Sequence, residues 1–86
     1  MDRYEIGMLA KSKVGHDAGN IYVIMDVDST YVYLADGKIR TLDRLKKKKK
    51  KHIQVIHRQY DVADVDDVAI KRILKVWNKE VNKQEE

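Results

Sequence analysis

The chain has 86 residues, a formal net charge of +4 and no cysteine. This length favours one domain, because two domains of about 40 residues each would usually need a metal or disulfides to fold. The missing cysteines exclude disulfides, thiolate zinc sites and cysteine nucleophiles, and they fit a reducing compartment. The longest apolar runs have five residues, far fewer than the ~20 that a membrane span needs. Residues 1–5 do not begin a secretory signal, so we expect a cytoplasmic protein without a membrane segment.

The basic residues are concentrated in one part of the chain. Residues 44–60 contain eight basic and no acidic residues, whereas the parts before and after each contain five basic and seven acidic residues. Such segregation is typical of a surface that binds a polyanion rather than of a surface tuned for solubility.

The first two thirds of the chain predict β-structure. Strands are expected, in chain order, at 6–14, 20–28, 31–36, 38–42 and 52–57. The second is the clearest, because apolar residues recur at every second position from Ile21 to Val27. Gly15 and Gly19 suit the first loop, and Asp36-Gly37 suits a two-residue hairpin turn between the third and fourth strands. Five short strands at this spacing predict a small closed or nearly closed barrel.

The last third changes to a helical period. Asp64 is the expected N-cap, with two further aspartates in the first turn, and the basic residues fall later, as the helix dipole favours. We expect the apolar face of this helix to cover the barrel, so that residues 1–60 and 61–86 form a single domain. That face contains Val65, Ala69, Ile70, Ile73, Leu74, Val76, Trp77 and Val81, and the opposite face contains Lys71, Arg72, Lys75 and Lys79.

The first loop carries a recognisable motif. Ile6-Gly7, the run AKSKVGHDAGN at 10–20 and the hydrophobic strand at 21–27 resemble a KOW motif. The later runs YLADG at 33–37 and RTL at 40–42 make the chain similar to KOW-domain RNA-binding proteins related to the large-subunit ribosomal proteins of the fourteen-e type. The resemblance covers residues 6 to about 57. It implies a five-stranded SH3-like barrel that binds RNA, most simply ribosomal RNA, with ribosomal proteins as further partners.

The same residues offer chemistry for binding phosphates. The loop glycines let the backbone approach a ligand closely, and six consecutive lysines repel one another unless an anion neutralises them. If six cations met phosphates of a single strand, log affinity would fall with log salt at a slope of about −4. Two simpler interpretations remain, a plain hairpin turn and a solvated connector. The candidate RNA-binding residues are Lys11, Lys13, His16, Asn20, Lys38, Arg40, Arg44, Lys46, Lys47, Lys48, Lys49, Lys50, Lys51 and Arg58, with Gly15, Gly19 and Gly37 as turn residues.

His16 stands where relatives with the motif commonly have Arg, so its positive charge is not permanent. Tyr22, Tyr31, Tyr33 and Tyr60 are candidates for stacking on unpaired bases, or else half-buried residues of the barrel.

No pattern favours an enzyme. The three histidines lack metal-ligand spacing, helix capping accounts for the aspartates at 64–67, and no base accompanies the serines. We expect no metal, cofactor or small-molecule substrate. The main alternative function is a protein-protein interaction module that uses the barrel and the apolar helix face, with Trp77 as an anchor. Attachment of the basic residues to acidic membranes is a further alternative.

Overall fold

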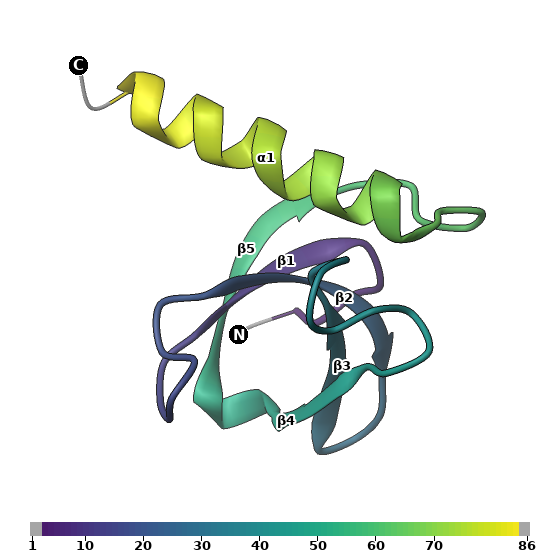
Figure 1. Ribbon diagram of the computed structural model, residues 1–86. Helices are drawn as coiled ribbons and strands as arrows, with labels where there is room; N and C mark the ends of the chain where they lie inside the picture. The colour runs from purple at the N-terminus through teal and green to yellow at the C-terminus, as the bar shows by residue number, and fades with distance from the viewer. Residues whose placement is uncertain (1–2, 85–86) are drawn as a thin grey trace.

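The structure is a computed structural model that describes residues 3–84. It contains one antiparallel five-stranded sheet, in the order β4-β3-β2-β1-β5, and one helix. The sheet curls strongly on itself, and the helix lies across its outer side (Figure 1). The fold is therefore mainly β with a C-terminal helix, as the sequence predicts. The elements are β1 (Met8–Ser12), β2 (Ile21–Val27), β3 (Tyr31–Ala35), β4 (Lys46–Lys49), β5 (Ile53–Gln59) and α1 (Asp67–Gln84).

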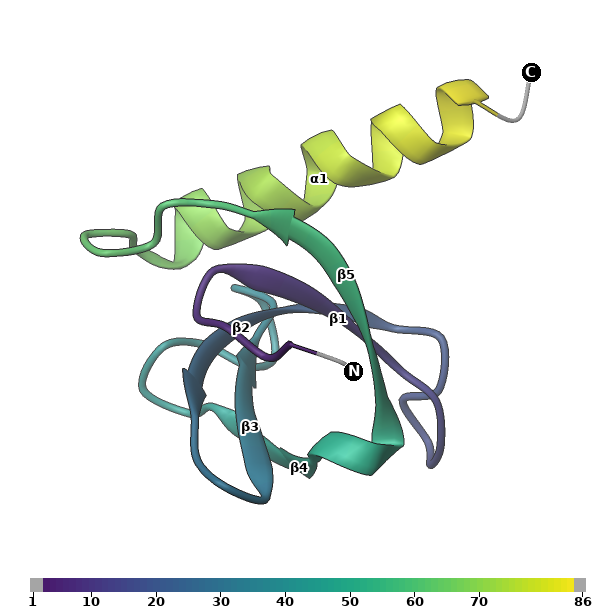
Figure 2. The same cartoon turned by 180° about the vertical axis from the view of Figure 1, so that it is seen from behind.

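The sheet is open at its edges in the described part of the chain, because β4 and β5 pair only with β3 and β1. A short 3₁₀ helix, Lys50–His52, joins these two edge strands. Figure 2 shows β5 rising from this turn to the level of α1.

Two hydrophobic clusters lie on the two faces of the curled sheet. Successive residues of a strand point to opposite faces, so Met8 and Ala10 of β1 enter the inner cluster while Leu9 enters the outer one. Strand β2 alternates in the same way, with Ile24 inside and Val23 outside. The central strands are thus buried on both faces, which explains their nearly continuous apolar sequence.

The outer cluster is closed by α1. Ile70 is fully buried there, and Ile73, Leu74 and Trp77 pack beside it. The predicted apolar face is correct in the main, but Val76 is 45% exposed. Most of the face suggested as a partner surface therefore covers the sheet of its own chain.

The helix starts later than predicted. Asp66, not Asp64, is its N-cap, because the Oδ1 atom of Asp66 accepts a hydrogen bond of 2.8 Å from the backbone N–H of Ala69. This arrangement satisfies one of the backbone donors that a helix leaves unpaired in its first turn.

The predicted strand at 38–42 is wrong. The Oδ1 atom of Asp36 accepts hydrogen bonds from the backbone N–H groups of Lys38 (2.8 Å) and Arg40 (2.9 Å), and these local bonds replace a strand ladder. Farther along, the Oδ1 atom of Asp67 accepts from the Leu42 N–H at 2.8 Å and ties the loop to α1. The segment between β3 and β4 is therefore a loop docked on the helix.

Gly37 is the point of closest approach in this loop. It has a φ of 79°, and a Cβ atom there would collide with the carbonyl oxygen of Asp67 and the side chain of Lys71. The residue is therefore needed as a glycine, although for helix contact rather than for the hairpin that the sequence predicts. The other four predicted strands agree with the structure within two residues at each end.

Candidate nucleic-acid interface

The lysine segment (residues 46–51) is ordered, and its first four residues form the edge strand β4. This strand pairs with β3, so that Lys46 lies opposite Leu34 and Lys48 opposite Val32. Paired residues share a face of the sheet, and both partners of these lysines are buried. The segment is therefore a paired strand rather than an irregular connector, and it sends alternate lysines to opposite faces.

Lys46 and Lys48 are held by a carboxylate of the glycine loop (residues 15–19). The Nζ atom of Lys48 lies 2.8 Å from Oδ1 of Asp17, and that of Lys46 lies 3.5 Å from Oδ2. Ser12 Oγ donates to Asp17 Oδ1 at 2.9 Å, and Tyr22 OH donates to Oδ2 at 3.0 Å. The Lys48 and Asp17 side chains are only 10% and 13% exposed. The strand and the loop are thus joined by one shared charge cluster, termed the Asp17 cluster.

The pKa values follow from these contacts. Burial raises the pKa of Asp17, but the hydrogen bonds from Lys48, Ser12 and Tyr22 outweigh it and hold the pKa well below its usual range. Asp17 is therefore ionised throughout the physiological range. The pKa of Tyr22 is raised, first by burial and further by the neighbouring Asp17 carboxylate.

The other side of the β3–β4 pair combines aromatic rings with exposed cations. Lys47 lies opposite Tyr33 and Lys49 opposite Tyr31. The Nζ atom of Lys47 is 4.2 Å from the centroid of the Tyr31 ring, close enough for a cation–π interaction. Tyr33 OH donates a 2.7 Å hydrogen bond to Asp28 Oδ2, which raises the pKa of Tyr33. We call these four residues, Tyr31, Tyr33, Lys47 and Lys49, the aromatic–lysine face.

The other two tyrosine candidates are less accessible. Tyr22 is only 3% exposed and belongs to the inner cluster, so its ring is not available for stacking. Tyr60 packs against the outer cluster beneath α1. Of the four candidates, only the two tyrosines of β3 share a face with exposed lysines.

His52 lies where the end of the lysine segment meets the strand that leads into the glycine loop. Its carbonyl oxygen accepts a 2.9 Å hydrogen bond from the Lys13 N–H, next to the glycine loop. The pKa of His52 is lowered, first by burial and then by the charges of Lys51, Lys49, Lys48 and Lys13. This environment favours the neutral form of His52.

A hollow of about 330 Å³ lies beside the glycine loop. His16 and Asn20 line it from the loop, Arg40 from the loop before β4, and Lys46 and Lys48 from β4. The structure therefore brings candidate residues from three separate parts of the chain around one depression.

The remaining candidates are more scattered. Lys11 is exposed on β1, and Arg44 is exposed in the turn before β4. Lys50 donates to the Ser29 carbonyl at 3.3 Å, and its Nζ lies 5.2 Å from the Tyr4 ring. Arg58 lies near the end of β5 that is remote from the glycine loop, where it pairs with Glu80 of α1. Arg58 is the candidate that the structure separates most clearly from the others.

Asp17 is the functional residue that sequence reasoning missed. It stands 31 residues before Lys48 in the sequence, so local patterns do not indicate the contact. The division of the β4 lysines into two sets could have been predicted, because a lysine run that forms a strand sends every second side chain to the same face.

No family model matches the chain, and no curated protein matches it. Within residues 3–84, no three His, Asp or Glu side chains are arranged to hold a metal ion. Within residues 3–84, no helix has both the length and the apolar character that crossing a membrane requires.

Proposed function

We propose that this protein binds RNA, in a ribosomal or ribosome-associated setting, through the glycine loop, the lysine segment and the aromatic–lysine face. One observation carries the proposal: the basic segment is folded against the glycine loop through the Asp17 cluster. This juxtaposition supports the proposal because one RNA strand can reach both segments. The proposed role is binding without catalysis.

We further propose that the curled sheet is an SH3-like barrel of the KOW type. The strand order supports this assignment, because β1 pairs with both β2 and β5 and so brings the last strand back to the first. The 3₁₀ turn between the two edge strands and the continuous inner cluster also support it. The resemblance at 10–27 and 33–42 agrees with the same architecture.

Recognition in this proposal rests on charge and stacking rather than on base reading. Lysine is a point charge that binds phosphates without fixing a base edge. Tyr31 and Tyr33 offer π surfaces beside Lys47 and Lys49, a combination suited to unpaired bases next to their phosphates. We therefore expect selection for RNA shape and single-stranded segments, with weak preference for sequence.

The structure reduces the expected salt dependence of the lysine segment. Lys46 and Lys48 already have a carboxylate partner in Asp17, so four of the six lysines are available for phosphates. At about 0.7 per phosphate of a single strand, their contribution to the log–log slope is about −3 instead of about −4. Between about 50 and 200 mM salt this contribution weakens binding about 50-fold.

The decisive variant neutralises three exposed lysines, in the triple substitution Lys47→Gln, Lys49→Gln and Lys51→Gln. Binding of a dye-labelled single-stranded RNA would be followed by fluorescence anisotropy across a salt series. We expect weaker binding and a slope that is shallower by about 2, from three lost phosphate contacts. Lys79→Gln on α1 is the control and should leave the slope unchanged. An unchanged slope in the triple variant, with wild-type protein binding RNA, would exclude the lysine segment from the interface.

The ribosomal setting needs a separate experiment. Ultraviolet crosslinking in cells, followed by sequencing of the attached RNA, should recover more ribosomal RNA with the wild-type protein than with the triple variant, which serves as the control. Recovery of other RNA classes with the same efficiency would contradict a ribosomal role while leaving RNA binding intact.

A further inference from the structure

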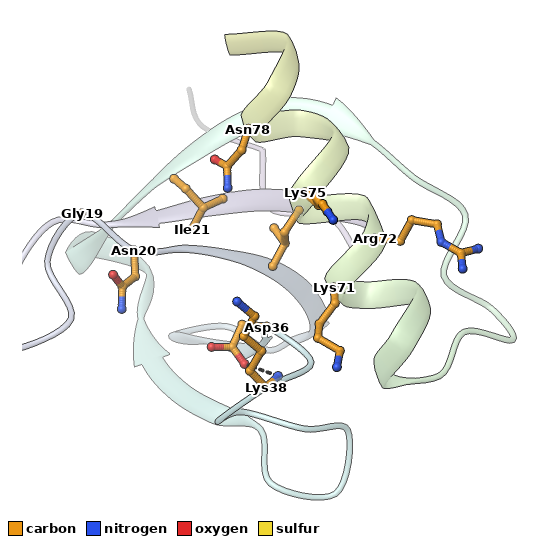
Figure 3. A pocket seen from close by; sticks show the side chains of 10 residues that line it. Gly19, Asn20, Ile21, Asp36, Lys38, Lys71, Arg72, Lys75 and Asn78 are labelled. Carbon is orange, nitrogen blue, oxygen red and sulfur yellow. Dashed lines mark hydrogen bonds between the residues drawn. The ribbon is translucent and has the colours of Figure 1, made fainter. Parts of the chain in front are cut away.

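A second basic depression lies between the sheet and α1. It is a groove of about 800 Å³, bounded by Asn20 and Ile21 on one side, the loop at 36–38 below and α1 on the other side (Figure 3). Lys71, Lys75 and Asn78 line it from successive turns of the helix. From Lys71 to Asn78 the helix rises by about 10 Å, which gives the groove an elongated wall.

This groove adjoins the hollow beside the glycine loop. Asn20 and Asp36 line both depressions. A ligand that contacts His16 and Arg40 in the hollow is therefore next to the groove along the helix. The two depressions are therefore neighbours on the surface of the molecule.

The lining of the groove is strongly basic. Its charged residues are Lys38, Lys71, Arg72 and Lys75, against the single acidic residue Asp36. Arg72 extends away from the centre of the groove, whereas Lys38 and Lys71 lie at its lower end (Figure 3). Within residues 3–84, no ion pair involves Lys38, Lys71 or Lys75. These three ammonium groups are thus available to an anionic ligand.

The single acid has a structural role already described. One oxygen of Asp36 accepts two backbone hydrogen bonds and shapes the turn at 36–40. Asn20 and Asn78 add neutral hydrogen-bonding groups beside the cations. Alternating cations and neutral polar groups suit a chain of phosphates, riboses and bases better than a uniform polyanion.

We propose that the groove between α1 and the loop at 36–38 binds a second stretch of RNA backbone, continuous with the strand held beside the glycine loop. This inference rests on the proposed RNA-binding function and extends it to α1, which the sequence resemblance does not cover. In this arrangement α1 both covers the outer cluster with its apolar side and binds phosphates with Lys71 and Lys75.

The first test is the double variant Lys71→Gln and Lys75→Gln, measured with the same labelled RNA and salt series. Both side chains are exposed and glutamine is a good helix former, so the fold should be retained. We expect a slope shallower by about 1.4, from two lost phosphate contacts. Lys79→Gln, on the same helix but outside the groove lining, should leave the slope unchanged. An equal effect per substituted lysine in both variants would reduce the result to net charge and overturn the inference.

The second test locates the RNA directly. Because the sequence has no cysteine, a single Asn78→Cys variant can be labelled with a photoactivatable crosslinker. We expect it to crosslink to bound RNA, whereas the same label at exposed Asp61→Cys, outside the groove lining, should not. Equal crosslinking at the two positions would overturn the groove assignment.

These outcomes separate the two proposals. If the wild-type protein binds no RNA even at low salt, the proposed function fails. If RNA binding depends on Lys47, Lys49 and Lys51 but not on Lys71 and Lys75, the function stands and the groove assignment fails. Tighter binding of the groove to phosphatidylserine vesicles than to RNA would also overturn the assignment.

Discussion

The Asp17 cluster makes a prediction in which stability and RNA affinity change in opposite directions. In the variant Asp17→Asn the side chain keeps its shape but loses its charge. Lys46 and Lys48 then lose their counter-ion, and the bonds from Ser12 and Tyr22 weaken. The Asp17 and Lys48 side chains are largely buried, at 13% and 10% exposure, so the loss is larger than for a surface pair.

The expected cost in the free energy of unfolding is about 2 kcal/mol. This lies within the range of about 1.5–3 kcal/mol for hydrogen bonds to charged groups. It is below the ~3–5 kcal/mol for breaking a fully buried pair, because Lys46, at 25% exposure, can turn toward solvent. For a domain of this size the melting temperature should fall by about 10 °C. The difference from wild type should narrow as pH falls below the ordinary aspartate pKa of 3.8, because the folded-state pKa is depressed and the stabilisation is lost in acid.

The same substitution should tighten RNA binding. Two lysines become available to phosphates, which makes the log–log salt slope steeper by about 1.4. Thermal melts by circular dichroism and anisotropy titrations measure the two effects. Asp61→Asn, which changes the net charge equally at an exposed position, is the matched control. The reasoning is refuted if Asp17→Asn is as stable as wild type, or if its salt slope does not steepen beyond that of the control.

Three further predictions concern the helix, the loop and the histidine beside the lysines. Ile70→Ala removes most of a fully buried side chain and should lower the free energy of unfolding, measured by urea denaturation, by about 3 kcal/mol. A loss below about 1 kcal/mol would mean that α1 is not docked as described. Gly37→Ala places a Cβ atom on a left-handed backbone position, against the carbonyl oxygen of Asp67. It should lower the free energy of unfolding by about 2 kcal/mol or more, and an unchanged stability would contradict the close contact. RNA phosphates should raise the lowered pKa of His52, so affinity should increase as acidification protonates its imidazole. His52→Gln should remove this component from a pH series at constant salt, and an unchanged pH dependence would place His52 outside the interface.

The elements that could be predicted are those whose pattern is local. The strand β2 follows from apolar alternation, and the outward cations of α1 follow from a helical period. The strand predicted at 38–42 failed because the Asp36 carboxylate binds two backbone N–H groups within four residues of itself. A side chain that offers the backbone local partners competes with sheet formation, and the apolar pattern does not contain that competition.

The candidate site was predictable only in part for a different reason. Charge counting identifies the lysine segment, but it treats all six lysines as equivalent. The division into two paired and four available lysines depends on Asp17, which the fold brings from a distant loop. Likewise, the groove cations of α1 become part of a surface only because the loop at 36–42 docks on the helix. Such contacts are properties of the tertiary structure.

The position of β4 at the border of the sheet gives its lysines another consequence. A border strand has unpaired backbone groups that can template pairing with a second molecule, and lysine side chains are a common protection against it. The exposed lysines of this strand, Lys47 and Lys49, would therefore keep neighbouring copies apart through mutual repulsion. Replacing these lysines with neutral residues would remove this protection against pairing. A bound nucleic acid would screen the same charges, so two copies bound side by side on one strand would repel each other less than two free copies.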